Sequence, residues 1–225
     1  METNSVTTSA KDLWNGGDSP FRVSYGKIMI WYFLISDTFT FAGLLISYGA
    51  IRSSHPKHVE GNMASWPDPN HVFNAGPGFH NAPLIFVTFM TFTLIVSSVT
   101  MVRAVQEGHA MNRAGVMKWM MWTIIGGLTF VLSQAWEWNH LIEEGMTPIG
   151  NPFGASSFGA LFFLITGFHG LHVSVGVLMN SWALIATKNR VFEKRGHYEM
   201  IEKLGLYWHF VDLVWVYVFL AFYLF

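Results

Sequence analysis

Five long apolar blocks constrain this chain more than any other feature. Crossing ~30 Å of hydrocarbon takes about 20 apolar residues at ~1.5 Å each in an α-helix. The blocks lack the period-two alternation that is typical of membrane barrel strands, so each is expected to be a helix. The sequence therefore predicts an all-α integral membrane bundle of five transmembrane helices, over residues 28–50, 82–102, 117–141, 158–186 and 204–225.

The basic residues predict how this bundle is oriented. Eleven of the 13 Lys and Arg residues lie in the N-terminal segment or in the connections after the second and fourth predicted helices. The other two, Arg52 and Lys57, lie in the connection after the first helix. Because basic residues gather on the cytoplasmic side, the N-terminus is predicted to be cytoplasmic and the C-terminus periplasmic. Residues 1–27 then form a cytoplasmic tail, and residues 28–225 form the membrane domain.

The composition excludes several kinds of chemistry. The chain has no Cys, which rules out disulfides, iron–sulfur clusters, copper sites built on thiolates and covalent haem attachment through CxxCH. Its formal net charge of −1 gives no indication of nucleic-acid binding. No small-residue cleavage pattern follows an early apolar run, so the first helix is expected to be retained and not removed as a signal peptide.

Ionisable side chains inside the predicted helices are the candidate functional residues. Such groups are costly in lipid, so they face the bundle interior, a cavity or a partner subunit. Counted by depth, they divide into a central layer and a cluster near the outer end of the third helix. The central layer contains Asp37, His169, His172, His209 and Asp212, and the outer polar cluster contains Gln134, Glu137 and His140.

The segment TGFHGLHV, residues 166–173, places two histidines of the central layer on one helix face. They could be metal or haem ligands, proton carriers, or groups that hydrogen-bond to neighbouring helices. An i,i+3 pair cannot bind both sides of one haem iron, although His169 or His172 opposite His209 could. Hydrogen bonding between helices is the favoured interpretation, and we expect one network that joins both histidines to His209 and Asp212 between the fourth and fifth helices.

Asp37 has no basic residue on its own helix face, so a proton-handling role and a packing role are equally open. The outer polar cluster occupies positions i, i+3 and i+6, which approximate one face at interfacial depth, where it could contact lipid or a partner. His55 and His58 form another HxxH spacing after the first predicted helix. Because no Cys or carboxylate lies at a fixed spacing from them, these two histidines predict no metal site.

Four segments together resemble subunit III of the haem–copper respiratory oxidases. They are MIWYFLISDTFTFAG, SQAWEWNHLI, TGFHGLHVSVG and LYWHFVDLVWVYVFL, and each occurs in the expected helix and order. The resemblance covers the chain from about residue 24. Five helices make it similar to a short bacterial form, without the first two helices of the seven-helix version.

The resemblance implies a non-redox accessory subunit of a proton-pumping terminal oxidase in a bacterial inner membrane. Such a subunit stabilises catalytic subunit I, binds phospholipid and supports proton uptake, while the haems and copper belong to partner subunits. Subunits I and II are the implied partners, with a larger respiratory supercomplex as a further expectation. Asp37 falls at the family's intramembrane acid position, and His169, His172, His209 and Asp212 match its buried polar core.

Alternatives to a cytochrome c oxidase remain at this point. The quinol oxidases have subunits III of the same kind, and Asp at position 37 leaves the electron donor open, with cytochrome c favoured. A haem-b-carrying membrane anchor of a quinone enzyme is a second alternative. A stand-alone proton-coupled carrier that uses Asp37 is a third, although its charged residues are few for a substrate path.

Overall fold

The computed structural model describes residues 23–56, 64–73, 75–76, 79–80 and 84–224. Its long helices are α2 (Tyr25–Ser54), α4 (Ile85–His109), α5 (Arg113–Glu143), α6 (Ser156–Lys188) and α8 (Glu199–Phe219), and α8 continues as the π-helix η1 (Leu220–Leu224). Short elements lie between them: α3 (Pro69–Val72), the antiparallel two-residue strands β1 (Ala75–Gly76) and β2 (Phe79–His80), and α7 (Val191–Arg195).

The fold class is confirmed, because five helices of the described chain are long and apolar enough to cross a membrane. Their number and order agree with the predicted spans, and most extend further at the polar ends. Helix α2 begins at Tyr25, within the segment predicted as a tail, since the Ser24 side chain caps it by accepting from the Lys27 amide. Helix α4 begins later than predicted, at Ile85, because Leu84 is left-handed at φ 67°. Orientation and domain division stay predictions.

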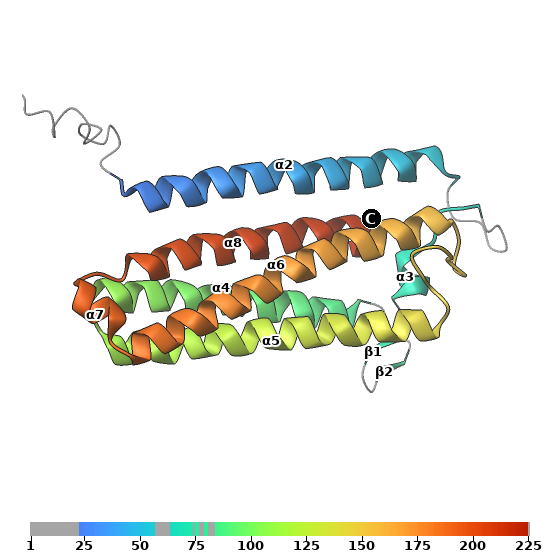
Figure 1. Ribbon diagram of the computed structural model, residues 1–225. Coiled ribbons are helices and arrows are strands. Elements are labelled where there is room, and N and C mark those ends of the chain that lie inside the picture. Colours follow the sequence, from blue (N-terminus) through green and yellow to red (C-terminus); the bar gives the residue numbers. More distant parts are fainter. Residues whose placement is uncertain (1–22, 57–63, 74, 77–78, 81–83, 225) are drawn as a thin grey trace, which may run out of the picture.

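The helices α4, α5, α6 and α8 form a four-helix bundle, and α2 lies along its outside (Figure 1). Helix α2 packs against α6 and α8 through Leu34, Asp37, Phe41 and Tyr48, which are the buried residues of its inner face. Most of its remaining surface is apolar and exposed, as expected for a helix that meets lipid or another membrane subunit.

Part of the long connection after α2 folds over one end of the bundle. Trp66 packs against Tyr48 of α2 and Phe158 of α6, with ring centroids 5.4 and 5.6 Å apart. Phe73 packs against Tyr223 at 4.2 Å. Residues 57–63 of the connection, including His58, lie outside the described residues.

Tryptophan side chains of α8 join it to α4 through hydroxyl groups. Trp208 Nε1 donates to Ser97 Oγ at 3.1 Å, and Trp215 Nε1 donates to Thr91 Oγ1 at 3.0 Å. Both indoles are buried, with exposed fractions of 1% and 0%. Each buried indole N–H therefore has a hydrogen-bond partner. The two hydrogen bonds fix how α8 lies against α4, in addition to the apolar packing between the helices.

Close helix packing around Trp208 depends on Gly127 of α5. A Cβ atom there would lie 2.5 Å from the Trp208 ring and 2.7 Å from Val177. We expect Gly127→Ala to lower the free energy of unfolding by about 1–3 kcal/mol, because the ring has no room to move. Thermal unfolding of the purified protein in detergent measures this.

The control is Gly170→Ala on α6, where no described atom lies within 4 Å of the added methyl group. That variant should be neutral or slightly stabilising, since Ala is the better helix former. Equal losses of unfolding free energy in the two variants would show that Gly127 is not needed to avoid a clash with Trp208.

Candidate functional site

Asp37 of α2 reaches across the helix interface to His172 of α6. Its Oδ2 lies 3.2 Å from His172 Nε2, and the two side chains are 9% and 13% exposed. Apart from this contact, Oδ2 has no hydrogen-bond partner among the described residues. The residue that lacked a basic partner on its own helix therefore has one on a neighbouring helix.

The other side of the His172 ring is also engaged. Nδ1 lies 2.7 Å from the carbonyl oxygen of Phe168, one turn earlier in α6. Because a carbonyl can only accept, Nδ1 carries a proton. The rings of Phe41 and Phe168 pack against the imidazole with centroids 5.4 and 4.6 Å away, and Tyr207 of α8 donates to the His172 carbonyl at 2.9 Å.

This tautomer decides what the pair can do chemically. With Nδ1 protonated, Nε2 offers Asp37 either a lone pair or a second N–H. One proton between Oδ2 and Nε2 gives either a carboxylic acid bonded to a neutral imidazole or a carboxylate bonded to an imidazolium. Loss of that proton would leave a carboxylate facing a lone pair in apolar surroundings, which is costly. The geometry therefore favours a pair that holds one proton.

The single network expected between α6 and α8 is wrong. His172 turns toward α2, whereas His209 of α8 places Nδ1 2.7 Å from Ser98 Oγ of α4. Asp212 Oδ1 is buried without a hydrogen-bond partner among the described residues. The expected partners differ because α8 packs against a hydroxyl-bearing face of α4, which offers His209 a nearer group than α6 does.

His169 is the most enclosed of the five central-layer residues. It is 0% exposed, its ring stacks on Trp215 with centroids 5.2 Å apart, and Phe130 packs edge-on at 5.8 Å. Neither ring nitrogen has a hydrogen-bond partner within the described part of the chain. Its contacts are those of an aromatic core side chain.

Two residues of the outer polar cluster, Gln134 and Glu137, face the bundle interior and not lipid. Glu137 accepts hydrogen bonds from Gln134 Nε2 and from the Tyr223 hydroxyl, both at 2.9 Å. Gln134 and Tyr223 are themselves buried. His140 does not join them: its Nε2 lies 3.3 Å from a Glu144 carboxylate oxygen. At ~100° per residue, positions i and i+6 point about 120° apart, which separates His140 from Gln134.

Tyr223 was missed by the sequence interpretation. It lies in η1, where the widened π-helical turn directs its side chain inward, to 1% exposure. The available signal was its position near the end of the last helix, at the same end of the bundle as Glu137.

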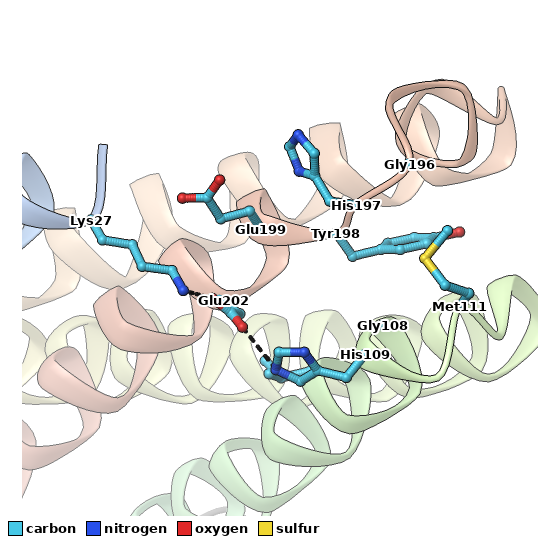
Figure 2. Close-up of a pocket in the computed structure, with 10 residues that line it drawn as sticks. Lys27, Gly108, His109, Met111, Gly196, His197, Tyr198, Glu199 and Glu202 are labelled. Atoms are coloured by element: carbon cyan, nitrogen blue, oxygen red, sulfur yellow. Dashed lines mark ion pairs between the residues drawn. The ribbon is translucent and has the colours of Figure 1, made fainter. Parts of the chain in front are cut away.

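A polar cavity lies between α2, α4 and α8 at the opposite end of the bundle, and the sequence patterns did not predict it. Lys27 of α2 and His109 of α4 both form ion pairs with Glu202 of α8, the second at 2.7 Å (Figure 2). The cavity measures about 370 Å³, and Glu199 and Tyr198 also line it. The predicted cytoplasmic end of α2 is thus held to the bundle by charge.

The described residues offer no group of three or more His, Asp or Glu side chains placed to hold a metal ion. The absence of metal and haem from this subunit stays a prediction. The haem-b alternative fits these residues poorly, because both ring nitrogens of His172 already meet protein groups and His209 faces Ser98. The ring nitrogens of His169 have no hydrogen-bond partner among the described residues, but its ring is fully buried against Trp215 and Phe130.

These observations define a multi-pass membrane protein with isolated polar pairs buried between its helices. A family model described as "Cytochrome c oxidase subunit III" matches residues 13–225. The chain belongs to this family, subunit III of the haem–copper oxidases. It is a multi-pass protein of a bacterial inner membrane and part of a respiratory oxidase complex with other oxidase subunits.

Several relatives are similar over most of their length. "Cytochrome c oxidase subunit 3" of Corynebacterium diphtheriae is 33% identical over 205 residues, 91% of this chain and 88% of the relative. "Probable cytochrome c oxidase subunit 3" of Mycobacterium tuberculosis (strain ATCC 25618 / H37Rv) is 33% identical over 204 residues, with the same shares. "Cytochrome bo(3) ubiquinol oxidase subunit 3" of Pseudomonas putida is 30% identical over 194 residues, 86% of this chain and 83% of the relative.

Tyr223→Phe tests the hydrogen bond at the outer polar cluster. Removing the hydroxyl leaves Glu137 with one donor, so we expect a loss of about 1–3 kcal/mol in unfolding free energy. Tyr217→Phe is the matched control, since Tyr217 lies on α8 and is 55% exposed. Denaturation midpoints of the two variants should differ clearly; identical midpoints would contradict a structural role for the Tyr223–Glu137 bond.

Proposed function

We propose that this chain is the non-redox subunit III of a cytochrome c oxidase. In this role it stabilises catalytic subunit I, binds membrane phospholipid and supports proton uptake by subunit I. The observation that carries the proton-related part is the buried contact between Asp37 and His172.

The pair suits a supporting role in proton delivery. Its single proton can move between Oδ2 and Nε2 without changing the net charge of the pair, and because apolar surroundings disfavour separated charges they favour the arrangement of a neutral carboxylic acid and a neutral imidazole. A site that always keeps one proton is a local store and not an obligatory relay. Asp37 would act on proton entry to subunit I through neighbouring water or lipid headgroups.

A non-catalytic, stabilising role is supported by the surface of the bundle. Large apolar side chains are exposed along its helices, including Trp31, Tyr32 and Phe39 of α2 and Trp122 and Leu132 of α5. Lipid and partner subunits are the surroundings that such a surface needs. Subunits I and II are the proposed partners, within a larger respiratory supercomplex.

Cytochrome c is the proposed electron donor, with quinol as the alternative. Relatives named for each kind of oxidase match the chain at similar identity, 33% and 30%. Neither donor would react on this subunit. Steady-state turnover of the purified complex with reduced cytochrome c and with quinol separates the two, and turnover with quinol alone would overturn the assignment.

Asp37→Asn tests the proton-related role. The amide keeps the size of the side chain and can donate to His172 Nε2, but it cannot exchange a proton. We expect the initial rate of electron transfer to stay close to that of the unchanged protein. Proton uptake should become slower at high pH, or the oxidase should inactivate sooner over many turnovers.

The matched control is Asp212→Asn, which neutralises a partly buried carboxyl that does not contact His172. It should leave the pH dependence of proton uptake unchanged. Two results would contradict the proposal: complete loss of oxidase activity in Asp37→Asn, which would make the residue essential, or unchanged pH dependence and lifetime, which would reduce it to packing.

A further inference from the structure

An open groove lies between the first turns of α5 and the last turns of α6. Its volume is about 910 Å³, and α7 contributes to its rim. The floor is apolar and contains Met117 and Met121 of α5 with Leu184 and Ile185 of α6. Met121 and Ile185 are 54% and 59% exposed, so the floor opens to the hydrocarbon that surrounds the bundle.

The end of this groove nearest the membrane surface is positively charged. Arg113, Lys118 and Lys188 line it, and Glu193 is the acidic residue among its lining side chains. Glu193 lies 3.8 Å from Arg190, so part of its charge is already offset. Within the described residues Lys118 and Lys188 take part in no ion pair, although Lys118 lies 5.4 Å from the Trp119 ring centroid.

Arg113 is fixed in position by backbone groups and not by a carboxylate. Its Nε donates to the Thr187 carbonyl at 3.1 Å and its Nη2 to the Lys188 carbonyl at 2.6 Å. A guanidinium carries five N–H donors, so donors remain for an anion. These two bonds cap the C-terminal end of α6 and join α5 to α6 beside the groove. They also hold the Arg113 guanidinium in place as a preorganised cation.

We propose that this groove binds an anionic phospholipid of the adjacent leaflet. The phosphate lies among Arg113, Lys118 and Lys188, and one acyl chain follows the apolar floor. Basic pockets between transmembrane helices suit anionic headgroups, and flexible Met side chains adapt to an acyl chain. This inference rests on the proposed phospholipid binding and assigns it a position, away from the Asp37–His172 pair.

A soluble phosphate or an acidic peptide would leave the apolar floor unused. A lipid with a neutral headgroup would leave the three cations without a counter-charge. An anionic phospholipid meets both parts of the groove at once, which is the reason for choosing it.

The test compares phosphatidylglycerol with phosphatidylcholine of the same acyl chains, each fluorescently labelled and titrated into the delipidated oxidase complex in mild detergent. The variant is Lys118→Gln with Lys188→Gln, which leaves the Arg113 cap intact. At about fivefold per basic residue, phosphatidylglycerol affinity should fall by about 25-fold. Phosphatidylcholine binding should not change.

The matched control is Lys194→Gln with Arg195→Gln, which removes two exposed charges of α7 outside the groove lining. It should leave phosphatidylglycerol affinity within about twofold of the unchanged complex, because both charges are exposed to water, are screened by salt and do not line the groove. Equal losses in the two double variants would overturn the site in favour of diffuse surface charge.

Other outcomes also overturn it. Equal affinity for the two lipids would remove the charge argument. Loss of a partner subunit from the Lys118→Gln, Lys188→Gln complex would show that the groove meets protein. Tight phosphatidylglycerol binding that the groove variant leaves unchanged would reject this position and keep the proposed phospholipid binding, whereas a complex that binds neither lipid would reject both.

Discussion

A carboxyl group inside a membrane needs a partner, and Asp37 has one in His172 across the α2–α6 interface. Helix α2 lies outside the four-helix bundle and buries only a narrow face, so this contact near its middle is a main source of its specificity. At its predicted cytoplasmic end, Lys27 bonds to Glu202, and at the other end Tyr48 packs against Trp66 and Phe222. Charge at one end, the Asp37–His172 contact in the middle and aromatic packing at the other end define one register for α2.

The same constraint organises the rest of the bundle in separate pairs. Indole N–H groups of α8 meet hydroxyl groups of α4, and Glu137 meets Gln134 and Tyr223. Each pair joins elements that apolar packing alone would leave free to slide, since lipid tails are as apolar as the helix surfaces. Because the polar groups of different pairs do not contact one another among the described residues, each hydrogen bond acts locally.

Hydropathy predicted the five spans because the length needed to cross a bilayer is a local property of the sequence. It also identified Asp37 and His172 as buried polar residues, but their pairing depends on how α2 lies against α6, which no local pattern specifies. His209 was expected to join a network with Asp212 and the histidines of α6, whereas its Nδ1 lies 2.7 Å from Ser98 Oγ of α4. The position of Tyr223 at the same end of the bundle as Glu137 could be read from the sequence, but its inward direction could not, because Tyr223 lies in a π-helical turn.

The central claim is that Asp37 and His172 act as one proton-holding unit in the assembled oxidase. A double-mutant cycle on the rate of proton uptake at high pH tests it most directly, with Asp37→Asn, His172→Gln and the double variant. If the two residues share one proton, the double variant should be no slower than the slower single variant. Effects of the two substitutions that multiply in the double variant would contradict the account, because they would show that Asp37 and His172 act independently.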